Sequence, residues 1–283
     1  MSTAADAPPE PALRRDRLIV MAGLAVIILV SWAYAVTGAG MQMSALEMTR
    51  MEMMQMHRVL SGQPVMAEGG TALNMTAWSA GYAITMFLMW WIMMIAMMLP
   101  TAVPMTLHYT TFAHKRDRDD TILLSTAAYV LGYVLIWGGF SIAGVILQWG
   151  LQRITLLTPM LVSDDLALDG FLILAAGIYQ FLPMQRNALR YCRSCKQAMP
   201  SRWREGTGGA LIMGVEEGIS CLGVCWLLMG LMFVAGAMNI YWIVALSLLV
   251  LLQKHLPSGD LLGYFIGVVL TIWGARVLVV SLF

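Results

Sequence analysis

The sequence predicts an all-α membrane protein, a polytopic bundle of about seven transmembrane helices with its N-terminus in the cytoplasm. Hydrophobic residues make up 59% of the 283 residues and charged residues only 12%, against about 45–50% and about 25% in soluble proteins. So few charges cannot cover a water-facing surface, and the high hydrophobicity also excludes a disordered chain. Several apolar stretches reach the roughly 20 residues that a helix needs to cross the hydrocarbon core. The formal net charge of +1 points to no acidic partner, and no nucleic-acid partner is expected.

The candidate spans follow a short polar start. Residues 1–13 contain three prolines and are expected to form a disordered tail, so that residues 14–283 make a single transmembrane domain. The first apolar stretch exceeds the 7–15 residues of a signal-peptide core and lacks a persuasive cleavage site, so we expect it to be retained. The seven candidate spans are Leu18–Gly38, Trp78–Leu99, Leu123–Trp149, Leu166–Leu182, Gly209–Ala237, Ile240–Leu252 and Leu261–Val280. The fifth is long, and the sixth is short and follows almost without a loop.

The orientation follows from the distribution of lysine and arginine. With the N-terminus inside, most of the 17 Lys and Arg residues fall in cytoplasmic segments, as the positive-inside rule requires. Outer loops then hold only Arg50, Arg58 and Arg153, and Arg276 lies within the last span. This arrangement makes 41–77 an external loop rich in methionine and 184–208 a basic cytoplasmic loop. It also predicts a multi-pass membrane protein.

Methionine is the unusual component, at 25 of 283 residues. The external loop begins with seven of them, Met41, Met43, Met48, Met51, Met53, Met54 and Met56, followed by His57. Thioethers select Cu(I) over hard ions, so this segment is a candidate for copper capture. An amphipathic helix at the membrane surface would use the same methionines as apolar filler, and that alternative stays open.

A second concentration lies in the second span. Met86, Met89, Met93 and Met97 fall on one face of a helix, where they would either pass a soft cation between sites or simply pack against neighbouring helices. Packing is the preferred interpretation of the stripe alone. Two prolines at positions 100 and 104 are expected to break or kink the helix. His108 follows on the cytoplasmic side as a candidate ligand.

All four cysteines fall in two pairs. Cys192 and Cys195 form a C-x-x-C in the basic loop, while Cys221 and Cys225 are one helical turn apart in the fifth span. Such pairs suit a zinc site, a Cu(I) thiolate site or a dithiol relay. Two separate pairs are favoured over one four-cysteine site, and the span-five thiols could also be small apolar packing groups.

Glu217 strengthens the functional interpretation of the fifth span. It shares a helical face with Cys221, Cys225 and Met229, so that carboxylate, thiol and thioether groups follow one another along the helix. A carboxylate at membrane depth is costly and normally faces a cavity or a partner. We therefore take these four residues as candidate metal ligands, together with Met93, Met97, His108, Cys192 and Cys195.

Three sequence blocks between residues 80 and 260 form a specific set. The first runs from Trp90-Trp91 through Met93-Met94, Ala96 and Met97-Met98 to Pro100; the second joins Ala176-Gly177, Tyr179-Gln180 and Pro183 to Cys192-Arg193-Ser194; the third contains Gly214, Gly218, Cys221, Gly223, Cys225-Trp226, Leu228-Met229, Met238-Asn239 and Trp242, and closes with Lys254 and Pro257. Together they resemble a bacterial family of predicted metal-binding integral membrane proteins, domain-of-unknown-function family 2182.

This chain departs from the family pattern at several positions. The family has cysteine where Ala188 and Val224 stand and usually proline where Cys195 stands, whereas Cys192, Cys221 and Cys225 match. The C-x-x-C is therefore not a family site. The resemblance implies metal binding and implies no particular reaction.

The leading hypothesis is an inner-membrane protein that binds or handles a soft metal, copper before zinc or another transition metal. Its partners would be the lipid bilayer, the metal ion, and a metallochaperone or membrane enzyme. The alternatives are a metal-dependent membrane oxidoreductase or oxygenase subunit, a membrane thiol–disulfide relay, and an assembly protein whose methionines only pack. No nucleotide, haem or flavin motif identifies a reaction.

Overall fold

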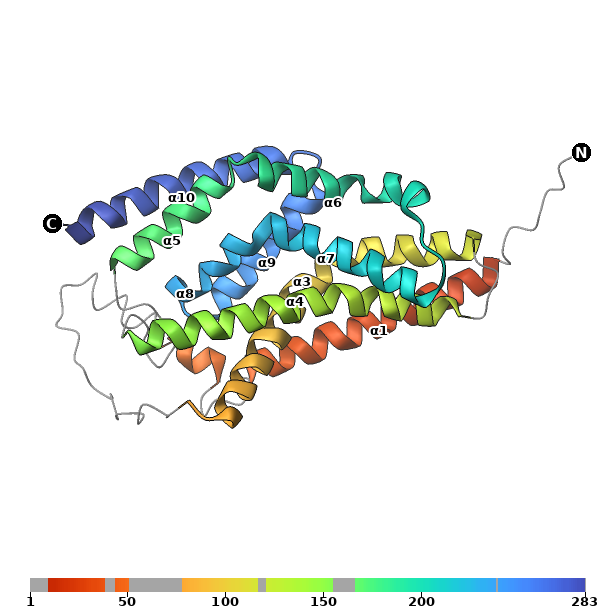
Figure 1. Ribbon diagram of the computed structural model, residues 1–283, viewed down its shortest axis with the longest axis horizontal. Coiled ribbons are helices and arrows are strands. Elements are labelled where there is room, and N and C mark those ends of the chain that lie inside the picture. The colour runs from red at the N-terminus through yellow and green to blue at the C-terminus, as the bar shows by residue number, and fades with distance from the viewer. Residues whose placement is uncertain are drawn as a thin grey trace, which may run out of the picture.

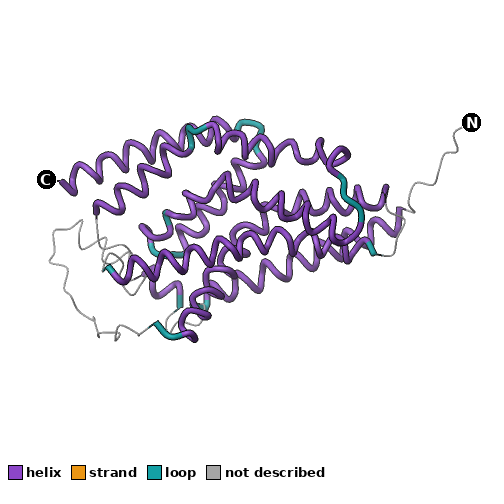
Figure 2. Tube along the Cα trace, viewed as in Figure 1, coloured by secondary structure: helices purple, strands orange, loops and turns teal. Residues whose placement is uncertain are grey.

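The computed structural model describes residues 10–38, 44–50, 78–116, 121–154, 166–237 and 239–282, and within these ranges it contains helices and no strand (Figure 2). The predicted all-α class is confirmed. The helices are α1 (Glu10–Val36), α3 (Ala80–Arg116), α4 (Ile122–Arg153), α5 (Leu166–Tyr179), α6 (Pro183–Arg202), α7 (Gly206–Gly230), α8 (Met232–Ala235), α9 (Ile240–His255) and α10 (Gly259–Leu282).

Five of these helical segments are long and apolar enough to cross a membrane: α1, α3, α4, α7 continued by α8, and α10. Helices α5 and α6 meet at a break bent by 57° and would count together as a sixth. Helix α9 is apolar but has only 16 residues, less than the roughly 20 that cross the hydrocarbon core unaided. The expected seven spans and their orientation therefore remain predictions.

The helices form an elongated bundle (Figure 1). Helix α4 packs along α7, α5 along α10, and α1 beside α3. The α4–α7 contact depends on glycine, because a Cβ on Gly214 would collide with the carbonyl oxygen of Tyr129. Close backbone approach through small residues is how helices pack tightly without a hydrophobic driving force. This close packing brings α7, which carries Cys221 and Cys225, against α4.

Helix α3 continues through both of its prolines and changes direction along its length (Figure 1). Proline removes a backbone donor and clashes with the preceding turn, which accounts for the bend. Neighbouring helices bond to the carbonyl groups of this region: the Tyr133 hydroxyl of α4 donates to Met98 O over 3.0 Å, and the Ser247 hydroxyl of α9 donates to Met97 O over 2.9 Å. Helices α4 and α9 are thereby tied to the middle of α3.

Two expected segments differ from the sequence-based picture. Residues 183–202, expected as part of a loop, form α6, because proline at the first helical position is followed by good helix formers. Helix α1 begins at Glu10, inside the expected tail; residues 1–9 lie outside the described ranges.

The Met-rich external segment is described only at residues 44–50. There Ser44 and Glu47 form a reciprocal capping box that opens a short helix: Ser44 N–H donates to the Glu47 carboxylate over 2.9 Å, and Glu47 N–H donates to Ser44 Oγ over 3.3 Å. The expected capture loop beyond it, with Met51 to His57, lies outside the described residues.

Candidate metal centre

The methionines of α3 form a buried layer at the centre of the bundle. The predicted stripe of Met86, Met89, Met93 and Met97 is buried, but Met94 and Met98 on the adjoining face are buried as well. Helix α3 is thus enclosed on more than one side. Burial alone gives Met93 and Met97 no role beyond packing, the interpretation preferred for the stripe.

The cysteine face of α7 is also completely buried. Glu217, Cys221, Cys225 and Met229 are all at most 3% exposed, and the face is turned toward α3 and α4. The Cys221 sulfur lies 3.1 Å from the Tyr133 hydroxyl and 4.0 Å from Thr101 Oγ1. Thiols with these neighbours are not packed in a purely apolar environment.

A contact between two soft ligands joins α7 to α3. The Cys225 Sγ atom lies 4.0 Å from Met98 Sδ. Cys221 precedes Cys225 by one turn, and its carbonyl oxygen accepts a hydrogen bond from the Cys225 thiol over 3.1 Å. Two sulfur ligands on one metal ion, each bonded at about 2.3 Å as in zinc sites, lie about 4 Å apart. Met98 and Cys225 therefore have the spacing that a shared soft ion requires, and Cys221 lies one helical turn from Cys225 on the same face of α7. These three residues are here called the sulfur cluster.

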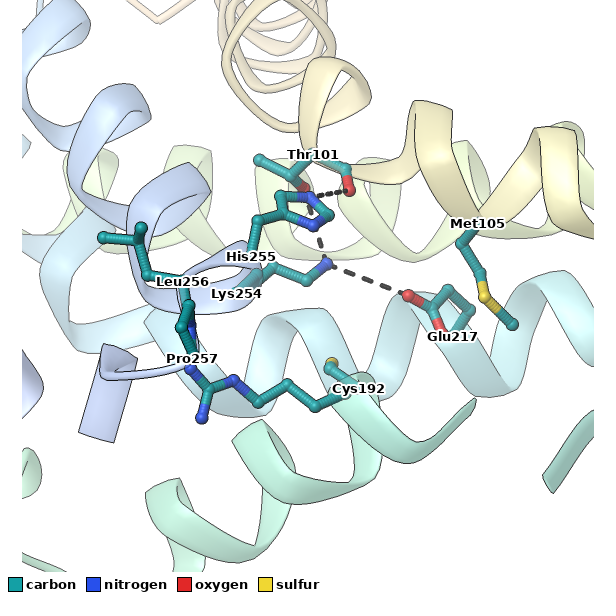
Figure 3. Close-up of a pocket in the computed structure, with 9 residues that line it drawn as sticks. Thr101, Met105, Cys192, Glu217, Lys254, His255, Leu256 and Pro257 are labelled. Carbon is teal, nitrogen blue, oxygen red and sulfur yellow. Dashed lines mark hydrogen bonds and ion pairs between the residues drawn. The ribbon is translucent and has the colours of Figure 1, made fainter. Parts of the chain in front are cut away.

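Beside the sulfur cluster lies a cavity of about 340 Å³. Four helices and the turn after α9 form its wall (Figure 3). The lining residues are Thr101, Met105, Cys192, Arg193, Glu217, Lys254, His255, Leu256 and Pro257. Thr101 connects the cavity to the cluster, since its hydroxyl lies 3.4 Å from Lys254 Nζ and 4.0 Å from Cys221 Sγ.

An ion pair crosses this cavity between α9 and α7. Lys254 Nζ lies 3.8 Å from Glu217 Oε1, and both side chains are only 4% exposed (Figure 3). Removing two charges from water is expensive, so a buried pair has to be well satisfied to be tolerated. The second carboxylate oxygen, Glu217 Oε2, is buried with no hydrogen-bond partner among the described residues. That oxygen is free to accept a proton or a cation.

The remaining predicted ligands lie in different places. Cys192 lines the large cavity, and Cys195 lines a smaller one that also contains Glu217. The two cysteine pairs thus lie on packed helices, α6 and α7, and all four thiols are free. Met229 is buried further along α7. His108 is half-buried and lines neither of these two cavities.

Four residues of this region were not among the predicted ligands. Met98, Thr101, Tyr133 and Lys254 make the contacts that surround Cys221 and Cys225. Met98 and Lys254 both belong to the sequence blocks, and a lysine at the end of an apolar helix is itself a signal of a polar partner. Nothing in a single sequence pairs Tyr133 with Cys221, because their contact joins helices that are 88 residues apart.

Within the described ranges, no three His, Cys, Asp or Glu side chains are grouped as metal ligands. Fold and site together define a helical protein with apolar spans and a sulfur-rich core.

Residues 87–277 match the family model described as PpoB2, copper chaperone, and the chain belongs to that family. The match supports the metal-related family that the three sequence blocks indicated, although under a different family name. No curated protein and no solved structure gives a significant match to this chain.

Proposed function

We propose that this protein is a multi-pass protein of the bacterial cytoplasmic membrane that binds Cu(I) as cargo at the sulfur cluster and passes it to a partner. The observation that carries the proposal is the 4.0 Å approach of Cys225 Sγ to Met98 Sδ, with Cys221 one turn away. The copper-chaperone family of the chain supports the same metal.

The ligand chemistry favours Cu(I) over the other ions considered. Thiolate and thioether are soft donors that suit Cu(I). Structural zinc sites are instead closed by four Cys or His ligands, and the sulfur cluster supplies two cysteines and a methionine. When Cu(I) binds, it replaces the thiol proton of each cysteine that becomes a ligand. Those protons leave to water in the adjoining cavity.

The large cavity is the proposed route between the cluster and a partner. It borders the cluster at Thr101 and is lined by Cys192, a third thiol. In the predicted orientation the basic helix α6 is cytoplasmic, so the cavity faces the side from which a cytoplasmic metallochaperone approaches. A membrane enzyme that needs copper is the other class of partner expected.

Copper binding by purified full-length protein tests the proposal. The protein is loaded anaerobically with Cu(I), and its affinity is measured by competition with a coloured Cu(I) chelator, with Zn(II) as the comparison ion. We expect the double variant C221S/C225S to lose the copper bound at the cluster. M98L should bind Cu(I) at least about tenfold more weakly, because replacing residues that only support metal ligands already lowers affinity by about 10–100-fold.

The matched control is M86L, since Met86 is equally buried on the same helix and lies three turns away. Leu for Met conserves volume and usually costs little stability, so M86L should bind copper as the wild type does. If C221S/C225S retained wild-type affinity and stoichiometry, the sulfur cluster would not be the copper site.

A further inference from the structure

A second, smaller cavity lies between α3, α4, α6 and α7, and Glu217 is part of its wall. Its volume is about 30 Å³, close to the share of one water molecule in the liquid. The residues that line it are Met105, Tyr129, Tyr191, Cys195, Met199, Arg202, Met213, Glu216 and Glu217. Four of these side chains carry sulfur.

The candidate ligands come from three helices, and two of these helices supply them in pairs with the same spacing. Cys195 and Met199 are one turn apart on α6, and Met213 and Glu217 are one turn apart on α7, so each pair projects from one face of its helix. Met105 joins them from α3. The three methionines are at most 7% exposed and pack in one cluster with Cys195.

A second observation points to a bound cation. The Glu217 side chain is 4% exposed, lines this cavity, and has its Oε2 atom buried without a hydrogen bond among the described residues. Of the other charges, Glu216 is paired with Arg204 over 2.9 Å, and Arg202 is exposed and lies over the Tyr191 ring at 4.4 Å. Glu217 is paired with Lys254 through Oε1, which leaves Oε2 as the carboxylate oxygen available to a ligand in the cavity.

We infer that this cavity is a second binding site for a soft monovalent cation, Cu(I), with Cys195, Met199, Met213, Met105 and Glu217 as its ligand set. Several thioethers with one thiol select Cu(I) over hard ions. On binding, Cu(I) replaces the thiol proton of Cys195, and that proton passes to water. No change of oxidation state is involved.

The position of the site suggests its use. Met105 and Glu217 line both this cavity and the large one, so they form the shared wall. An ion that leaves the sulfur cluster through the large cavity meets the second site next. This order of sites rests on the proposed function, whereas the second site itself does not.

Methionine methyl NMR and Cu(I) titration of the full-length protein in detergent test the inference. In protein labelled at the methionine ε-methyl groups, anaerobic Cu(I) should shift the resonances of Met199 and Met213, assigned from the single Leu variants. The double variant M199L/M213L should bind about one equivalent of Cu(I) less than the wild type. C221S/C225S should lose a different equivalent while the shifts at Met199 and Met213 persist.

M184L is the matched control, because Met184 also lies on α6 but is 60% exposed and lines neither cavity. It should keep wild-type stoichiometry, and equal thermal unfolding of all variants shows that they fold. Unchanged copper stoichiometry in M199L/M213L, or absent shifts at both methionines, would overturn the second site. Shifts at Met199 and Met213 with no copper lost in C221S/C225S would support the second site and contradict the proposed function.

Discussion

The buried ion pair of Lys254 and Glu217 determines the charge next to the sulfur cluster. Its two side chains come from α9 and α7, and each is 4% exposed. Breaking a buried pair by removing one partner typically costs about 3–5 kcal/mol, because the other charge stays buried without compensation. Removing both charges costs far less.

We therefore expect K254M to lower the free energy of unfolding by about 3 kcal/mol, toward the low end of that range because Glu217 can take up a proton. The double variant K254M/E217Q should be more stable than K254M alone. Thermal unfolding in detergent measures both, with K115M, at an exposed lysine of α3, as the neutral control. A double variant less stable than K254M would show that the pair is not a coupled unit.

A second residue-scale prediction concerns pH. Hydrogen bonds from the Ser44 backbone N–H and from its hydroxyl lower the pKa of Glu47, which lies outside the apolar helices. Because the folded-state pKa lies below the unfolded value, the capping box stabilises its helix above the ordinary carboxyl pKa of about 4.3 and loses that effect as the pH falls through the lowered value.

Amide hydrogen exchange of residues 45–50 between pH 3 and pH 7 measures this effect. In the wild type, we expect the protection of these amides against exchange to fall toward pH 3. In E47Q, their protection should be weaker throughout and independent of pH. This short helix also contacts α9, because Thr49 Oγ1 accepts a hydrogen bond from the Ile240 N–H at the start of α9. An unchanged acid response in E47Q would assign the effect to another group.

Residue spacing placed part of the candidate site on one helix face and missed its contacts between helices for a physical reason. Glu217, Cys221, Cys225 and Met229 share a helix, so a period of 3.6 residues was enough to place them on one buried face. Met98 was missed because the stripe through Met97 was chosen, and helical periodicity does not say which face of an all-apolar helix meets α7. Contacts between helices, such as that of Cys225 with Met98, depend on packing that no local pattern encodes.

At the scale of elements, glycine decides how closely α7 approaches α4. A Cβ on Gly214 would meet the Tyr129 backbone, and one on Gly218 would lie 2.9 Å from Ile136 Cβ. Backbone cannot yield as a flexible side chain does, so G214A must push the helices apart. Overpacking of this kind typically costs about 1–3 kcal/mol.

We expect G214A to lower the thermal unfolding temperature and to weaken Cu(I) binding, because Tyr133 on α4 and Cys221 on α7 lie 3.1 Å apart across this interface. G230A on the same helix is the control, since a Cβ there meets no atom within 4 Å. It should be neutral or slightly stabilising. If G214A were destabilised but bound Cu(I) with wild-type affinity, copper binding would not depend on the spacing of α4 and α7.

Element boundaries were predicted well for α4 and α10 but not for α3, which continues past its predicted end at Leu99 to Arg116. Helix α4 closely matches its predicted span, but α6 was expected as a loop because its basic residues carry no continuous apolar stretch. Its amphipathic pattern was the available signal. The break between α5 and α6, at Gln180 to Leu182, likewise follows Gly177 and precedes Pro183, residues that punctuate helices.

At the scale of the whole molecule, the basic residues at the start of α1 and the end of α3 lie at one end of the bundle. Helix α1 starts and α3 ends at that end, where His114 lies 3.0 Å from Asp16, and α10 ends at the opposite one (Figure 1). Three arginines precede the apolar part of α1, and Lys115 and Arg116 close α3. This clustering is what the positive-inside rule requires of the cytoplasmic end.

We therefore expect the start of α1 and the turn at Ser258 to be cytoplasmic and the end of α10 to be external. Reporter fusions test it: a phosphatase that is active only outside the cytoplasm should be active after Leu282 and inactive after Ser258, and a cytoplasmic fluorescent reporter should show the reverse. Fusion after Thr37, at the end of α1, is the internal control for an external site. Activity after Ser258 would place both cavities on the outer side and reverse the proposed direction of copper transfer.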